Sequence, residues 1–276
     1  MTSSFEQSNY YVGAGAPQKI MWILEDKMRS LGVRNMADIT FFNPGGAMFG
    51  VKHYSDKLEQ IRQERDVNAK FGHQLVAVDP ENKVATFKNV TTGEIVKEDF
   101  DMLHATPPMV APDVIKTSPL ADAKGWVDVD KNTLQSNKFP NVFGLGDCTN
   151  TPNSKTAAAI TAQAPVLAHN LQKQMDGKTL DASYNGYASC PLIISQNKVM
   201  LAEFGYGGKL METFAKNGGK YPIGTDGELQ QRFFYVLKER LFPYVYWNFW
   251  PRGMWYGTYG PMRPDVGGSN SVGDGK

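Results

Sequence analysis

The sequence predicts an α/β fold with a doubly wound sheet that is interrupted by a β-meander. Apolar residues recur at intervals of three and four over residues 18–31 and 52–65, which predicts two amphipathic helices. A buried strand is expected over residues 37–42, and three β-rich runs separated by turn residues follow over residues 75–100. Because strands alternate with helices, we expect an open sheet with right-handed crossovers.

The ends of these elements carry start and stop signals. Pro17 falls in the first turn of the first helix, where its missing N–H is tolerated, and Gly32 follows the last periodic residue. The preceding small-residue turn, residues 13–17, lacks the G-x-G-x-x-G spacing and is typical of close packing. A short strand over residues 101–106 ends at a Pro-Pro pair.

The second half of the chain predicts a strand, a turn and a helix, followed by more β structure. The stretch PNVFGLGDCTN, residues 140–150, indicates a strand and a small-residue turn. A helix is expected over residues 155–175, with Ser154 as its N-cap. Residues 187–195 and 198–206 are two further β-like runs separated by turn residues.

The composition leaves several classes of function without support. Lys and Arg number 29 and Asp and Glu 28 among 276 residues, a net charge of +1, so a nucleic-acid partner is not expected. Two cysteines form neither a disulfide framework nor a four-thiolate metal site. The four histidines lack metal-ligand spacing, and no Ser-His-Asp arrangement or carboxylate pair is evident. Hydrolase and metalloenzyme functions therefore have no positive support.

The C-terminal region favours contact with a membrane surface. No targeting segment is evident at the start of the sequence, and no apolar stretch reaches the roughly 20 residues that span a bilayer. Residues 241–259 hold nine Tyr, Trp and Phe side chains, interrupted by prolines, with Lys238, Arg240 and Arg252 before or among them. Such rings belong at a bilayer interface, where basic side chains meet lipid phosphates. The alternative is a C-terminal flap of the core.

The turn Gly144 to Cys148, GLGDC, is the most specific local motif. In open α/β sheets, ligands bind outside the carboxyl ends of the strands, so Asp147 is placed to accept a hydrogen bond from a bound polyol. The N-terminus of the next helix would present free N–H groups and a positive dipole end there. The alternative is an ordinary turn with an N-capping acid.

Lysines and cysteines supply the remaining candidates. Lys19 and Lys155 are expected in the first turns of helices, an unfavourable place for a cation, so an anionic ligand would compensate. Solvated lysines on amphipathic helices are the alternative. Cys148 and Cys190 are either buried and inert or reactive.

Several longer stretches, in this order along the chain, resemble the mitochondrial-type sulfide:quinone oxidoreductases, flavoproteins of the disulfide-reductase-like superfamily. The stretches are GAGAPQKIM, GWVDVDKNTLQ, GDCTNTPNSKTAAAITAQ, YASCPLI, VMLAEFGY and YWNFWPRGMWYG. The resemblance implies that Asp147 contacts the FAD, that Lys155 faces the flavin ring and that Lys19 lies near the active site. It also implies that Cys190 is the redox cysteine that receives sulfane sulfur.

The same resemblance implies a division of the chain. Residues 13–138 correspond to a second, NAD-binding-like Rossmann domain, and residues 139–180 to the C-terminal part of a FAD-binding domain. Residues 181–266 correspond to a quinone- and membrane-associated region. Residues 1–12 do not match the family, and the low-complexity residues 267–276 are predicted to be disordered.

Two features of the family are missing. No G-x-G-x-x-G fingerprint for the FAD pyrophosphate precedes Gly13, and Gly13 itself stands where the family has its other redox cysteine. The expected fold class is therefore an incomplete two-dinucleotide-binding-domain flavoprotein fold with a C-terminal membrane-associating region. We interpret the sequence as an N-terminally truncated gene model or an alternative start.

The resemblance implies a reaction at the mitochondrial inner membrane. Sulfide attacks a cysteine disulfide and leaves a persulfide, two electrons pass through FAD to ubiquinone, and sulfur then leaves to a small acceptor. Lys155 and the neighbouring helix N-terminus would stabilise charge on the reduced flavin. The alternative is a catalytically inactive fragment that folds partly and associates with lipid; flavin binding discriminates between the two.

Overall fold

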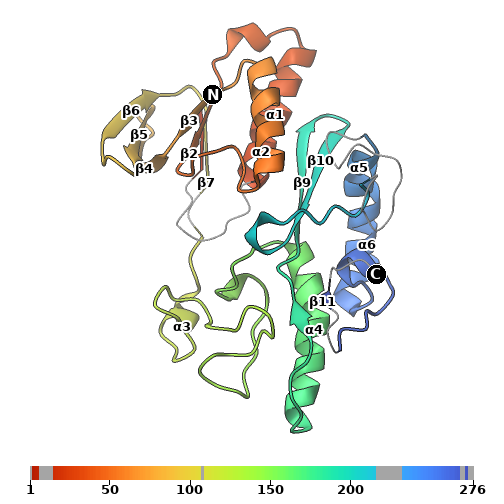
Figure 1. Ribbon diagram of the computed structural model, residues 1–276. Coiled ribbons are helices and arrows are strands. Elements are labelled where there is room, and N and C mark those ends of the chain that lie inside the picture. Colours follow the sequence, from red (N-terminus) through yellow and green to blue (C-terminus); the bar gives the residue numbers. More distant parts are fainter. Residues whose placement is uncertain (1, 6–14, 107–108, 216–231, 268–270, 273–276) are drawn as a thin grey trace. The chain divides into compact units, whose positions relative to one another are not determined.

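A computed structural model describes residues 2–5, 15–106, 109–215, 232–267 and 271–272 of the chain (Figure 1). The chain forms two compact units. Unit 1 comprises Met1–Met109, Pro191–Met200 and Leu229–Arg232, and unit 2 comprises Val110–Cys190, Leu201–Glu228 and Phe233–Lys276. The first continuous segment of unit 1 ends at Met109, whereas the sequence-based division has its boundary at residues 138/139.

Unit 1 is built around a parallel sheet with the strand order β3-β2-β1-β7. Its strands are β1 (Thr2–Phe5), β2 (Thr40–Asn43), β3 (Asn68–Phe71) and β7 (Leu103–Thr106). The crossover helices are α1 (Gly15–Ser30) and α2 (Lys52–Glu64). Both predicted helices and the strand after the first of them are therefore confirmed, with ends shifted by a few residues.

A β-meander covers the other face of the sheet (Figure 1). It consists of the antiparallel strands β4 (His73–Asp79), β5 (Val84–Asn89) and β6 (Ile95–Asp99), as predicted. Phe42 of β2 stacks on Phe87 of β5 with ring centroids 3.8 Å apart, and both rings are fully buried. Helices thus cover one face of the sheet and the meander covers the other, where the apolar side chains of the sheet and of the meander pack together.

Two strands of this sheet were not predicted. β3 alternates exposed and partly buried residues, and Asn68 and Lys70 interrupt its apolar pattern. β1 lies between β2 and β7 in the centre of the sheet, although the residues 1–12 to which it belongs do not match the family stretches. Residues 6–14, which include Gly13, lie outside the described residues.

Unit 2 contains one long helix, α4 (Ala157–Met175), and several short elements. These are α3 (Asp113–Lys116), η2 (Gly146–Cys148), β8 (Ser183–Tyr184) and η3 (Tyr206–Gly208). The predicted N-cap of the long helix, Ser154, is wrong: Thr156 caps α4, its hydroxyl accepting a hydrogen bond from the Ala159 N–H at 3.2 Å. The strand expected within residues 140–150 is also wrong, because Phe143 forms only an isolated bridge to Gln135.

The two later β-like runs are strands, as predicted, and they pair with each other. Its strands are β9 (Ala188–Ser195) and β10 (Lys198–Phe204), and Asn197 in the turn has a φ of 70°. Asparagine tolerates this left-handed conformation better than most residues, which explains a tight turn at this position.

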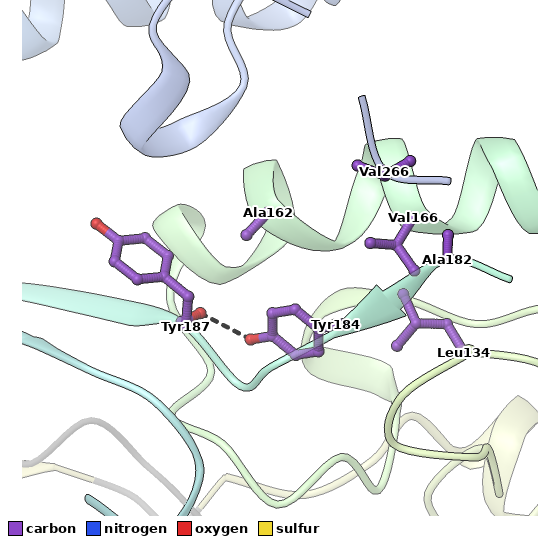
Figure 2. Packing of buried hydrophobic residues seen from close by; sticks show 7 residues of the cluster. All are labelled: Leu134, Ala162, Val166, Ala182, Tyr184, Tyr187 and Val266. Carbon is purple, nitrogen blue, oxygen red and sulfur yellow. Dashed lines mark hydrogen bonds between the residues drawn. The ribbon is translucent and has the colours of Figure 1, made fainter. Parts of the chain in front are cut away.

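The core of unit 2 packs against the inner face of α4 (Figure 2). Its buried members are Leu134, Ala162, Val166, Ala182, Tyr184, Tyr187 and Val266. Ser271–Val272 (β11), within the residues 267–276 that the sequence predicts to be disordered, pairs in parallel with β8. Residues 268–270 and 273–276 lie outside the described residues.

The aromatic C-terminal region is helical at its start. The segments α5 (Arg232–Val236), the π-helix η4 (Leu237–Leu241) and α6 (Phe242–Asn248) follow one another without a gap. The wide π turn precedes Pro243, which has no N–H to donate and would crowd the preceding turn of a regular helix. Short 3-10 turns follow at η5 (Trp250–Arg252) and η6 (Gly257–Tyr259). Over the described part of the chain, no helix has the length and apolarity needed to cross a bilayer.

Candidate functional site

The GLGDC motif forms a tight turn that is fastened to helix α4. Leu145 is extended, and Gly146 has a φ of 76°, a backbone conformation that favours glycine. The Gly146 N–H donates to the Gln163 side-chain oxygen at 2.6 Å, and the Thr149 hydroxyl donates to the Gly146 carbonyl at 2.9 Å. The turn therefore has one fixed position relative to the N-terminus of α4.

Asp147 projects from this turn into solvent. Its side chain is exposed and makes no hydrogen bond or ion pair with any described residue. The capping role belongs to Thr156, so the alternative of an N-capping acid does not describe this turn. The Asp147 carboxylate lies beside a helix N-terminus, and its oxygens accept no hydrogen bond from the described residues.

Lys155 is half-buried rather than solvated. Its Nζ donates to the Thr149 carbonyl at 2.5 Å and lies 4.3 Å from the centroid of the Trp126 ring, a cation–π contact. Burial lowers the pKa of the Lys155 ammonium, and the nearby Asp147 and Cys148 oppose that shift. Lys155 precedes the N-cap, so the prediction that it lies in the first helical turn is wrong.

Cys148 lies in the same loop, half-buried beside Lys155. Its thiol donates to the Leu145 carbonyl at 3.3 Å. Burial raises the pKa of the Cys148 thiol, and the positive charge of Lys155 acts in the opposite direction. Lys155 therefore provides the favourable electrostatic contact for an anion in this loop.

This arrangement predicts the effect of removing the Lys155 charge. In a Lys155→Met variant the pKa of Cys148 rises further, so less thiolate is present at a given pH and alkylation of Cys148 slows several-fold. The rate profile moves to higher pH, as mass spectrometry after timed iodoacetamide treatment would show. Lys155→Arg keeps the charge and serves as the control. Equal slowing in both variants would show that packing, not charge, sets the reactivity.

Cys190 occupies a different place in the fold. It lies in β9, 6% exposed, directly before Pro191. Cys148 and Cys190 are not joined by a disulfide in the structure. Cys190 is the more enclosed of the two, which agrees with a buried, inert cysteine as well as with an enclosed redox site.

Lys19 lies on α1 in unit 1 and is partly exposed. The helix begins at Gly15, so Lys19 is in the second turn rather than in the first. The structure brings Asp147, Cys148 and Lys155 together in one loop of unit 2. Trp126, which covers the Lys155 ammonium, was not predicted; it lies in the stretch GWVDVDKNTLQ, but no local pattern marks its ring as a partner. The described residues contain no cluster of metal-ligating side chains.

Unit 1 has the strand order and crossovers of a doubly wound α/β domain. No protein-family model matches the chain. The chain is 47% identical over 254 residues to the mitochondrial sulfide:quinone oxidoreductase of Schizosaccharomyces pombe, a match covering 91% of this chain and 54% of that protein. It is 46% identical over 245 residues to the mitochondrial sulfide:quinone oxidoreductase of Mus musculus, covering 88% of this chain and 52% of that protein.

A solved structure shows the same fold. The X-ray structure of the sulfide:quinone oxidoreductase from Aquifex aeolicus aligns with a TM-score of 0.67 and 16% identity, over 89% of this chain and 57% of that chain. The resemblance to sulfide:quinone oxidoreductases is thus confirmed, and over the aligned residues the chain is related to the mitochondrial members of that family. The chain spans about half the length of the curated relatives it matches.

Proposed function

We propose that this chain carries the flavin-facing part of a sulfide:quinone oxidoreductase, in which sulfide is oxidised and two electrons pass through FAD to ubiquinone. The observation that carries the proposal is the loop of Asp147, Cys148 and Lys155 at the N-terminus of α4, in a chain 46–47% identical to enzymes of that name. The partial match in length makes the whole reaction a proposal for this chain.

The residues of the loop fit a flavin. Asp147 has open acceptor positions that suit ribityl hydroxyls, and the first N–H groups of α4 suit an electron-rich ring edge. When bound, FAD supplies the acceptor for the electrons of sulfide and passes them on to the quinone. Lys155 would hold its positive charge beside the ring and stabilise negative charge that develops there.

Cys190 is proposed as the residue that carries sulfane sulfur before its transfer to a small acceptor. Its thiol is enclosed, which would protect a persulfide from water and from other thiols. Lys19 is proposed to lie near the active site of the assembled enzyme. The division into an NAD-binding-like domain, part of a FAD-binding domain and a quinone-associated region belongs to the same proposal.

The aromatic C-terminal region is proposed to rest on the mitochondrial inner membrane and admit quinone. Leu241, Tyr244 and Trp247 recur at helical spacing and are 41%, 59% and 72% exposed, whereas Val245 between them is buried. An interfacial anchor typically exposes apolar and aromatic side chains on one face of a helix and has basic residues nearby. The core-flap alternative accounts for Val245 and Phe234, which are buried, but not for the exposed face.

Liposome binding tests this region. A variant with serine in place of Leu241, Tyr244 and Trp247 is expected to bind vesicles at least about tenfold more weakly. The reason is that three apolar side chains no longer enter the bilayer interface. Anionic lipid should strengthen binding of the unmodified chain through Lys238, Arg240 and Arg252, by roughly 1 kcal/mol each. The control replaces two exposed apolar residues of α4, Leu171 and Met175. Equal loss in both variants would remove the anchor role.

Titration of the purified protein with FAD tests the proposed function as a whole. Binding is read from quenching of tryptophan fluorescence, because Trp126 lies against Lys155 at the proposed flavin-facing loop. Sulfide and a ubiquinone analogue are then added in turn, and the visible flavin absorbance reports reduction and reoxidation. A chain that binds no flavin favours the alternative, a catalytically inactive fragment that associates with lipid.

A further inference from the structure

A buried tyrosine hydroxyl joins the residues before Cys190 to the loop of Asp147 and Lys155. Tyr184 of β8 is fully buried, and its hydroxyl donates to the Tyr187 carbonyl at 2.7 Å (Figure 2). The Asn153 side-chain amide donates to the same hydroxyl at 2.6 Å. One oxygen atom thus connects a residue two positions before Lys155 with a residue three positions before Cys190.

The connection continues to the GLGDC turn. The Gln163 side chain also interacts with the Tyr184 hydroxyl, and its oxygen accepts the hydrogen bond from the Gly146 N–H at 2.6 Å. The loop is therefore tied to Tyr184 near both of its ends, through Gln163 at Gly146 and directly at Asn153. Burial raises the pKa of Tyr184 well above its usual value, so the hydroxyl remains a donor.

Tyr187 is fixed through its side chain as well. It is 5% exposed, and its hydroxyl donates to the carboxylate of Glu203 on β10. That carboxylate also accepts the Thr213 N–H at 2.8 Å and the Thr213 hydroxyl at 2.8 Å. Because β9 begins at Ala188, the direction in which the strand leaves Tyr187 determines where Cys190 lies.

We propose that Tyr184 is a positioning residue for Cys190: its hydroxyl sets the start of β9 relative to the loop of Asp147 and Lys155. The inference rests on the proposed function in so far as Cys190 is taken as the redox cysteine. Tyr184 belongs neither to the loop nor to β9, yet its hydroxyl connects them. The proposal gives a role to this buried polar network within the apolar core of unit 2.

The substitution Tyr184→Phe removes one oxygen and leaves the ring in the core. The Tyr187 carbonyl and the Asn153 amide then lose a buried partner, which favours local opening at the start of β9 by about fivefold. Cys190 is 6% exposed, so its alkylation requires such opening, and its rate should rise by the same factor. Cys148 lies in the loop that the same hydroxyl fastens, so the reference is the Cys190 rate of the unmodified protein.

Tyr206→Phe is the matched control. The Tyr206 ring lies 5.6 Å from the Tyr184 ring, and its hydroxyl donates to the Lys131 carbonyl at 2.5 Å, away from β9. Both variants lose a phenolic oxygen from neighbouring rings. Iodoacetamide labelling is timed over a series of pH values well below the melting temperature, and mass spectrometry gives the Cys190 rate of each variant relative to that of the unmodified protein.

The expected result is a Cys190 rate about fivefold higher in Tyr184→Phe at each pH, while Tyr206→Phe keeps the rate of the unmodified protein. A lower melting temperature with an unchanged Cys190 rate would overturn the proposal, since a purely structural role predicts that result. If Tyr184→Phe does not fold, Asn153→Ala replaces it, and an unchanged Cys190 rate there is equally contrary. The labelling needs no flavin or sulfide, so it can fail while flavin binding succeeds, and the reverse.

Discussion

Replacing Glu25 by glutamine is expected to lower the free energy of unfolding of unit 1 by about 3 to 5 kcal/mol. The Glu25 carboxylate is fully buried in α1 and faces three guanidinium groups. Arg29 pairs with one oxygen, Arg34 approaches the same oxygen at 3.6 Å, and Arg65 approaches the other at 3.3 Å. Removing the negative charge leaves the buried guanidinium of Arg65, whose side chain is 10% exposed, without its counter-ion.

The matched control is Glu59→Gln on helix α2. Glu59 pairs with Arg62, but its side chain is 34% exposed, so the loss should be about 0.5 kcal/mol. Urea unfolding followed by tryptophan fluorescence measures both, because Trp22 is buried in unit 1 with Arg65 over its ring. Similar losses in the two variants would mean that the arginines around Glu25 find other partners.

Replacing Gly186 by alanine is expected to cost more than about 3 kcal/mol and to disturb the start of β9. Gly186 has a φ of 86°, where a side chain is strained. An added methyl group would also lie 2.6 Å from the backbone nitrogen of Tyr206, and backbone cannot move away as a flexible side chain can. The substitution therefore adds backbone strain at position 186 and a steric overlap with the Tyr206 backbone, directly before Tyr187.

Gly177→Ala separates these two contributions. Gly177 has a φ of 66° but nothing within 4 Å of the added methyl group, so only the conformational strain remains, about 1 kcal/mol. Thermal unfolding of both variants gives the comparison. Equal destabilisation would show that the Tyr206 segment yields to the methyl group at little cost.

Much of the fold could be predicted because local signals and tertiary packing agree. Pro17 lies in the first turn of α1, and Gly32 follows its last turn. The apolar period of α2 matches its buried face, and clear turns separate the strands of the meander. The strands β1 and β3 could not be predicted, because four residues with polar members carry no distinct period. Their place in the sheet is set by neighbours far along the chain.

The candidate site was predictable only in part. The GLGDC turn drew attention to Asp147 and the resemblance to Lys155, and both lie in one loop. The cap at Thr156 was missed because Ser154 and Thr156 offer equivalent hydroxyls two residues apart, and only the packing of α4 selects one. Trp126 and Tyr184 were missed because their partners lie 29 and 31 residues away, as for Trp126 with Lys155 and Tyr184 with Asn153.

The most direct measurement is FAD binding by the chain and by its Asp147→Ala variant. FAD is expected to quench the tryptophan fluorescence of the unmodified protein and to stay with the protein through gel filtration. Asp147→Ala should weaken binding markedly, whereas Asp176→Ala, another exposed aspartate of unit 2, should leave it unchanged. Absence of flavin binding, or equal binding by all three proteins, would contradict the claim that the loop of Asp147, Cys148 and Lys155 is a flavin site.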